Sequence, residues 1–169
     1  TDPDLAEAVC NSAEHRALAL EAARQSIVLL KNEGNLLPLG SRSRRILVAG
    51  PNAAAERNQL GDYSGTSTVT TVLQGIRARA GDAEVQYVRG CGVKDMDESG
   101  IAEAVSAARE SDLAILVLGE SSWTEGMVCG EGNDRADLDL PGVQQQLLEA
   151  VYATGTPVVL VLINGRPLS

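Results

Sequence analysis

The stretch "LAILVLGE", residues 113–120, is a continuous apolar run that ends in Gly and Glu. Such a run predicts a strand that is buried on both faces, as strands of parallel sheets are. Two more runs of this kind are "RILVAG" at 45–50 and "PVVLVLING" at 157–165. The run "EVQYVRG" at 84–90 predicts a further strand. The sequence therefore predicts a sheet of about four strands, in which the three apolar runs are buried.

Helical patterns separate these strands. The segments "STVTTVLQGIRARAG" at 67–81 and "SGIAEAVSAARES" at 99–111 repeat apolar residues at helical spacing, and Ser99 is the expected N-cap of the second. A third helix is predicted at 142–155, where Gly155 can close it. Strands that alternate with helices indicate an α/β three-layer sandwich with a mainly parallel sheet. Because the chain stops just after its last strand, this sheet is expected to be truncated.

The first part of the chain has a different pattern. Over residues 4–32 apolar side chains recur at a helical period, with an expected break near "CNSAEH" at 10–15 and Gly34 as the stop signal. We expect residues 1–40 to form a helical segment and linker that packs on the domain. Residues 41–169 are expected to form the α/β sandwich domain, incomplete at its C-terminus and without a catalytic barrel.

Composition and charge exclude several classes of protein. The formal net charge of -9 argues against binding to nucleic acid, which needs clustered Lys and Arg. No apolar run approaches the roughly 20 residues that span a bilayer, so no membrane partner is expected. The three cysteines are scattered and His15 is the only histidine, so we predict no metal site and no cofactor. The compartment stays open between cytoplasmic, periplasmic and secreted.

Ligands of parallel α/β sheets bind outside the carboxyl ends of the strands, so the loops that follow the strands are candidate sites. The segment "GPNAAAERNQLG" at 50–61 lacks the glycines of a phosphate-binding fingerprint, which disfavours nucleotide binding. The segment "DMDESG" at 95–100 has the acids of a calcium loop, but Ser106 stands where the bidentate Glu belongs. The longest loop, at 119–142, is of a length that is uncommon without a function.

This longest loop is rich in acids and glycines. Cleavage of a glycosidic bond needs a carboxylic acid beside the leaving oxygen, with a pKa raised by desolvation or by a like charge. Glu131 lies between two glycines, which lets backbone and substrate come close. Trp123 can form a flat wall against a sugar ring, and Arg135 can orient an acid or hold the loop. An ordinary solvated loop is the alternative. The carboxylates in question are Glu120, Glu125, Glu131, Asp134, Asp137 and Asp139.

Successive signatures of a known family cover nearly all of the chain from Ala17 onward. They are, in order, "QSIVLLKNEGNLLPL", "ILVAGPNA", "QLGDYSG", "EGNDRADLDLPGVQQQLLEAV" and "PVVLVLINGRPLS". Together they resemble the second domain of the family 3 glycoside hydrolases. The combination of the "LLKN" and "LPL" segment with the final "GRP" segment is far more specific than any single short motif.

The resemblance implies the α/β sandwich domain of a retaining exo-β-glycosidase such as a β-glucosidase or a β-xylosidase. In this family a first domain, a (β/α)8 barrel, carries an Asp nucleophile and most contacts to the terminal sugar. An E-G-x-D-R pattern carries the general acid/base in many members, and it matches Glu131 to Arg135 here. Glu131 is therefore the implied acid/base. Glu125 is its rival, because some relatives carry this residue soon after a "GE" strand end.

The same resemblance supplies the remaining expectations. Asp134 and Arg135 match the family pattern as residues that fix the loop, and the position of Trp123 in the loop, rather than the pattern, suggests the aglycone side; these three are the candidate substrate-binding residues. The implied reaction is hydrolysis of terminal β-D-glucosyl or related residues from a β-linked oligosaccharide or glycoside. Without the barrel the chain is expected to be inactive. The alternatives are a non-catalytic sugar-binding or interface module and, disfavoured by the missing phosphate motif, a nucleotide-binding domain.

Overall fold

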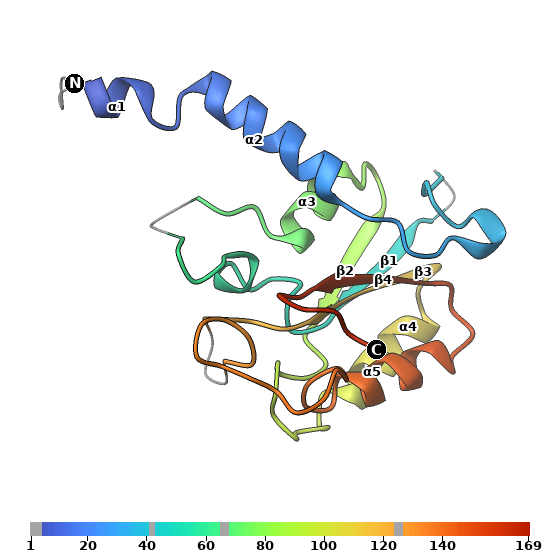
Figure 1. Ribbon diagram of the computed structural model, residues 1–169. Helices are drawn as coiled ribbons and strands as arrows, with labels where there is room; N and C mark the ends of the chain where they lie inside the picture. The colour runs from blue at the N-terminus through green and yellow to red at the C-terminus, as the bar shows by residue number, and fades with distance from the viewer. Residues whose placement is uncertain (1–4, 41–42, 65–67, 124–126) are drawn as a thin grey trace. The chain divides into compact units, whose positions relative to one another are not determined.

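The computed structural model describes residues 5–40, 43–64, 68–123 and 127–169 (Figure 1). The chain divides into two compact units, residues 1–38 and residues 39–169. Among the described residues, no helix is both long enough and apolar enough to cross a membrane.

The first unit holds two α-helices, α1 (Ala6–Val9) and α2 (Ala13–Ser26), and the short 3-10 helix η2 (Glu33–Asn35). The break between α1 and α2 was predicted, and the Ser12 side chain caps α2 by accepting from the backbone N–H of His15 at 3.3 Å. The prediction of helix as far as residue 32 was wrong. The helix ends at Ser26, because Ile27 turns into an extended conformation and the β-branched pair Ile27 and Val28 disfavours a further helical turn.

The second unit is built on a four-stranded parallel sheet in the order β2-β1-β3-β4. The stretch quoted first forms β3, and its every residue is buried, because it lies between two neighbouring strands and under helices. The predicted α/β fold with a mainly parallel sheet is confirmed. The strands are β1 (Arg45–Ala49), β2 (Glu84–Val88), β3 (Leu113–Gly119) and β4 (Val158–Ile163).

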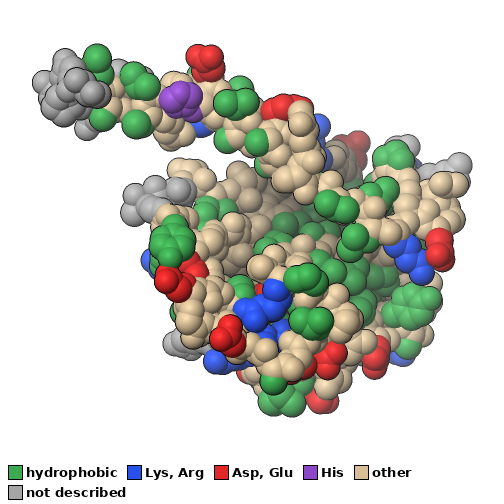
Figure 2. Space-filling model, viewed as in Figure 1, with side chains coloured by type: hydrophobic (Ala, Val, Ile, Leu, Met, Phe, Trp, Pro, Cys, Tyr) green, Lys and Arg blue, Asp and Glu red, His purple; other side chains and the backbone are tan. Residues whose placement is uncertain are grey.

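Helices cover both faces of this sheet. Ala114, Leu116 and Leu118 of β3 share one buried cluster with residues of α4 (Ile101–Arg109) and α5 (Gln144–Tyr152). The alternate side chains of β3 point to the opposite face, on the side where Figure 1 shows α3 (Val72–Arg79). The loop after β1 also contains the short 3-10 helix η3 (Arg57–Gln59). Hydrophobic side chains gather around the sheet on the face drawn in Figure 2.

Two local predictions were wrong. The N-cap of α4 is Gly100 rather than Ser99, because the Ser99 side chain and its backbone N–H, the latter at 2.9 Å, both bond the Asp97 carboxylate in a turn before the helix. The strand β4 was predicted to be buried but is only partly covered, and Leu160 is 40% exposed. Its position explains this, because β4 is the edge strand of the described sheet and has a neighbour on one side only.

Candidate active site

The loops that follow β1, β3 and β4 meet at the carboxyl edge of the sheet, as the topology predicts. The side-chain amide of Asn52, fully buried after β1, donates to the carbonyl oxygen of Glu120 after β3 at 3.1 Å. The backbone N–H of Gly165, after β4, donates to the Glu120 carboxylate at 3.1 Å. Three segments that are far apart in the sequence are thus joined around one residue at the end of β3.

Glu131 lies on the surface of this edge, and two consecutive residues of the loop after β1 hold it. Its backbone N–H donates to the Asp62 carboxylate at 2.6 Å, and the Tyr63 hydroxyl donates to its Oε2. Gly130 precedes it with a φ of 104°, and a side chain there would collide with the Asp62 carboxylate. The absence of a side chain at Gly130 therefore allows a close approach of the Asp62 carboxylate. The Glu131 side chain itself is exposed, so this unit alone does not desolvate it.

Tyr63 is the partner of Glu131 that the sequence analysis missed. Its hydrogen bond to the Glu131 carboxylate raises the pKa of Tyr63, and desolvation and the nearby charge of Asp62 add to this effect. The phenol therefore stays protonated at neutral pH and remains a donor to the carboxylate. Asp62 and Tyr63 belong to the "QLGDYSG" signature at 59–65, which marks this segment but does not indicate its contact with Glu131.

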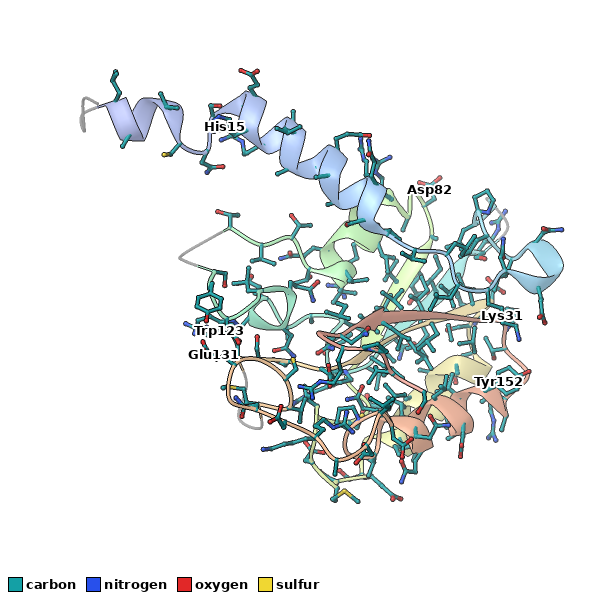
Figure 3. The ribbon with its side chains drawn as sticks, viewed as in Figure 1. His15, Lys31, Asp82, Trp123, Glu131 and Tyr152 are labelled. Atoms are coloured by element: carbon teal, nitrogen blue, oxygen red, sulfur yellow. The ribbon has the colours of Figure 1, made fainter. Side chains whose placement is uncertain are left out.

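Trp123 lies close to Glu131, as Figure 3 shows, because adjacent residues anchor the two. Its indole N–H donates to the carbonyl oxygen of Gly61 at 2.8 Å, next to the Asp62 that holds Glu131. The guanidinium of Arg57 lies 5.6 Å from the centre of the indole ring, within the range of a cation–π contact. The ring is partly exposed, so an aromatic surface and a carboxyl group stand side by side.

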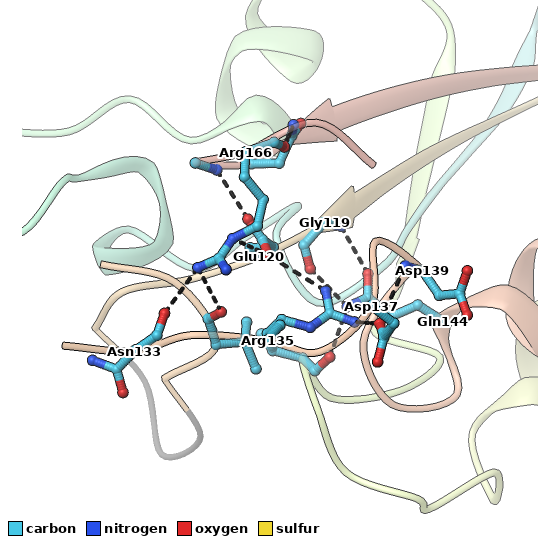
Figure 4. A network of polar contacts seen from close by, with 12 residues as sticks. Gly119, Glu120, Asn133, Arg135, Asp137, Asp139, Gln144 and Arg166 are labelled. Carbon is cyan, nitrogen blue, oxygen red and sulfur yellow. Dashed lines mark hydrogen bonds and ion pairs between the residues drawn. The ribbon is translucent and has the colours of Figure 1, made fainter. Parts of the chain in front are cut away.

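A buried ionic network lies beneath this surface (Figure 4). Its centre is Glu120, which is 1% exposed. The Oε1 atom of Glu120 is 3.2 Å from Nε of Arg166 and 3.4 Å from Nη1 of Arg135. A carboxylate without partners at such a position would be strongly destabilising, and two guanidinium groups and one backbone N–H compensate for its burial.

Both arginines continue into the loop that bears Glu131. Nη2 of Arg166 donates to the carbonyl oxygens of Val128 at 3.2 Å and of Asn133 at 2.9 Å. Nη2 of Arg135 donates to the Asp137 carboxylate at 2.6 Å. The Arg135 side chain contacts Glu120 and Asp137 and not Glu131, and its role in holding the loop stays a prediction.

The other candidates are placed as follows. Asp134 is exposed. Glu125 lies outside the described residues. A cavity of about 650 Å3 lies at the opposite, amino-terminal end of β1, lined among others by Ile46, Ile76 and Ile115, and no candidate site residue lines it. Within the described ranges, no group of three or more His, Cys, Asp or Glu side chains could hold a metal ion.

A parallel α/β sheet with an acidic, arginine-anchored loop at its carboxyl edge is the setting of a ligand-binding or catalytic domain. The family description "Glycosyl hydrolase family 3 C-terminal domain" matches residues 27–169. The chain therefore belongs to glycosyl hydrolase family 3 and corresponds to its C-terminal domain, which confirms the resemblance seen in the sequence.

Similar proteins agree with this assignment. The chain is 48% identical over 165 residues to a beta-xylosidase from Formosa agariphila, with 92% of this chain and 22% of the relative covered. It is 38% identical over 179 residues to a periplasmic beta-glucosidase from Salmonella typhimurium, with 92% and 23% covered. The chain thus spans less than a quarter of the length of these relatives.

Solved structures agree as well. A β-glucosidase from Erythrobacter marinus superimposes with a TM-score of 0.84 at 39% identity, covering 100% of this chain and 26% of that one. A beta-glucosidase from Listeria innocua, solved in complex with glucose, superimposes with a TM-score of 0.80 at 31% identity, covering 94% and 21%.

Proposed function

We propose that Glu131 is the general acid/base of a retaining exo-β-glycosidase whose nucleophile, an Asp, lies on a (β/α)8 barrel outside this chain. The observation that carries the proposal is the presentation of the Glu131 carboxyl. Its backbone is tied to Asp62 and its Oε2 to Tyr63, while the side chain stays exposed at the sheet edge. The Glu131 carboxyl is thus fixed in position and still accessible to a substrate that a second domain binds.

The proposed reaction has two steps. In the first, Glu131 gives its proton to the departing aglycone oxygen while the Asp attacks the anomeric carbon and forms the glycosyl-enzyme. In the second, Glu131 takes a proton from the water that hydrolyses this intermediate. The substrate is a β-linked oligosaccharide or glycoside with a terminal glucosyl or related residue, as the names of the relatives suggest.

The neighbours of Glu131 take supporting roles in this proposal. Trp123 borders the aglycone, because its partly exposed ring is anchored beside the acid. Arg135 fixes the loop through Glu120 and Asp137, and exposed Asp134 remains a candidate contact to the substrate. The desolvation that a catalytic acid needs would come from the barrel and the bound sugar, since the unit described leaves the carboxyl exposed.

The test is Glu131→Ala in the full-length enzyme, with Glu125→Ala as the matched variant for the rival position. We expect kcat/KM for substrates with poor leaving groups to fall by about 100-fold or more, and activated aryl glycosides to be affected much less. Azide should restore turnover of the activated substrates, because it attacks the glycosyl-enzyme without a general base. Unchanged rates on all substrates would remove Glu131 from the role, and a selective loss in Glu125→Ala would transfer the role to the rival.

A second candidate function is non-catalytic sugar binding. The observation in its favour is the pair of aromatic residues beside the acid, exposed Tyr63 and partly exposed Trp123. Because Trp123 is the only tryptophan of the 169-residue chain, its fluorescence reports binding directly. Saturable quenching by glucose or xylose, together with full activity of Glu131→Ala in the complete enzyme, would support this function over the first.

A further inference from the structure

The proposed chemistry leaves the buried carboxylate of Glu120 without a role. The backbone N–H of Glu120 donates to the carbonyl oxygen of Ile163 at 2.8 Å, so the residue continues the pairing of β3 with β4 and its position is rigid. Its side chain is fully shielded from solvent. A carboxylate that is costly to bury thus lies at the end of the β3–β4 ladder, beneath the loop.

Arg166 connects this rigid point to the loop of Glu131. Its Nε lies 3.2 Å from Glu120, and its Nη2 contacts the carbonyl oxygens of Val128 and Asn133. These two carbonyls stand before and after Glu131 in the sequence, so one planar guanidinium holds both ends of the short segment that bears the acid. A guanidinium presents its donors in a fixed geometry, which an ammonium group does not.

The segment forms one turn of its own, in which the backbone N–H of Asn133 donates to the carbonyl oxygen of Gly130 at 3.2 Å and its side-chain amide to that of Glu131 at 3.0 Å, but these contacts do not tie it to the sheet. Both glycines that flank Glu131 have positive φ, 104° at Gly130 and 76° at Gly132, and the segment forms no helix or strand. Asp62 and Tyr63 hold Glu131 from the side of the β1 loop, and both of these residues lie on the surface or near it. Arg166 ties this segment to Glu120 at the end of β3, and Arg135 contacts the same carboxylate from the part of the loop that follows Glu131.

We propose that Glu120 and Arg166 are positioning residues that set the place of the Glu131 carboxyl relative to the leaving oxygen; this inference rests on the proposed function. Neither residue contacts the substrate. Glu120 fixes the guanidinium of Arg166 on the end of β3, and Arg166 fixes the backbone on both sides of Glu131. Displacement of a catalytic group by about 1 Å can cost roughly 100-fold in rate, so this pair controls proton transfer and not the binding of the terminal sugar.

The experiment compares Arg166→Met, Arg166→Lys and Glu120→Gln in the full-length enzyme, across aryl and alkyl glycosides of graded leaving-group pKa. For Arg166→Met, kcat/KM should fall by about 10- to 100-fold on poor leaving groups and by less than about threefold on activated ones. Arg166→Lys should recover part of the loss, and Glu120→Gln should show the same leaving-group dependence as Arg166→Met. Arg109→Met, on an exposed residue of α4, is the matched control and should leave all rates unchanged.

A merely structural role gives a different result. Loss of folded protein lowers the rate on every substrate by one factor, so an equal loss across leaving groups overturns the inference, as does no loss at all. Should Arg166→Met fail to fold, Arg166→Lys and Glu120→Gln decide the question in the same way, because they conserve size or shape.

A double-mutant cycle separates this inference from the proposed function. If Arg166 acts through Glu131, then adding Arg166→Met to Glu131→Ala should change kcat/KM by less than about twofold. A full additional loss in the double variant overturns the positioning role. If Glu131→Ala itself shows no leaving-group dependence, the proposed function fails. If Glu131→Ala shows leaving-group dependence and the Arg166 variants show none, only the positioning role fails.

Discussion

At the scale of single residues, Gln144 shows how a buried polar side chain can join three parts of the second unit. Its Nε2 donates to the carbonyl oxygens of Val93 and of Gly119, each at 2.7 Å, and its Oε1 accepts from the backbone N–H of Gly119 at 2.8 Å. The first turn of α5 is thereby fixed to the end of β3 and to the segment after β2.

We predict that Gln144→Ala lowers the free energy of unfolding by about 3 kcal/mol, because it leaves buried backbone groups of Gly119 and Val93 without partners. Gln145→Ala is the matched control. This neighbour is exposed and its side chain donates to Glu149 on the same helix, so its replacement should lower the free energy of unfolding by less than about 0.5 kcal/mol. Urea unfolding of the variants measures both values, and equal effects would contradict the assignment.

Individual site residues could be singled out by residue type, by flanking glycines and by the family pattern. Glu131 and Arg135 were named on these grounds, and their roles stay predictions. The contact of Tyr63 with Glu131 joins residues 68 positions apart, and no local pattern encodes such a pairing. Glu120 was one of six acids in its loop; its burial depends on the arginines that the fold brings to it, and Arg166 was read as part of a signature and not as its partner.

At the scale of elements, an apolar run alone could not distinguish a central strand from an edge strand. The prediction was correct for β1 and β3, which have a neighbouring strand on each side. It was wrong for β4, whose composition is just as apolar but whose outer side has no neighbour in the described sheet. Strand order is a property of the tertiary fold, so the pattern of one strand does not contain it.

The end of β3 provides a test of the pairing between β3 and β4. Gly119 has a φ of 126°, and a Cβ atom there would collide with the carbonyl oxygen of Ile163. We predict that Gly119→Ala lowers the free energy of unfolding by about 3 kcal/mol or more, through backbone strain and the clash.

Gly75→Ala, inside α3, is the matched control for this substitution. A Cβ atom at Gly75 meets nothing within 4 Å, and alanine favours the helix. The free energy of unfolding should therefore rise by about 0.5–1 kcal/mol. Thermal unfolding of the two variants gives the sign of each change. A destabilisation of similar size at both positions would show that the steric account is wrong.

At the scale of the whole molecule, the two units differ in how they bury their side chains. The helix α2 has no buried residue, and Ile27, Val28, Leu29 and Leu30 after it are 63–80% exposed. The second unit has a continuous core of aliphatic residues between its sheet and the helices α4 and α5. The sequence indicated the change of pattern between these parts, but the depth of each core depends on which surfaces meet, which a linear pattern does not specify.

The cysteines differ in burial in the same way as the two units. Cys10, in the first unit, is exposed, while Cys91 and Cys129 are buried in the second. Desolvation, assisted by the negative charge of Asp95, raises the pKa of Cys91 to about 12, so its thiol is neutral at pH 8. Because the thiolate is the reactive form, we predict that iodoacetamide at pH 8 modifies Cys10 at least about 100 times faster than Cys91.

Mass spectrometry of time-resolved alkylation measures these rates. Alkylation in urea above the unfolding transition is the internal control, because unfolding should make the rates of Cys10, Cys91 and Cys129 similar. Comparable rates for Cys10 and Cys91 in native buffer would contradict the packing around Cys91.

The contacts of Arg166 go to main-chain oxygen atoms of the Glu131 loop and not to its side chains. These two contacts therefore do not depend on which side chains residues 128 and 133 carry. A change of side chain at either position leaves the acceptor atoms in place, whereas a change of Arg166 removes both hydrogen bonds at once.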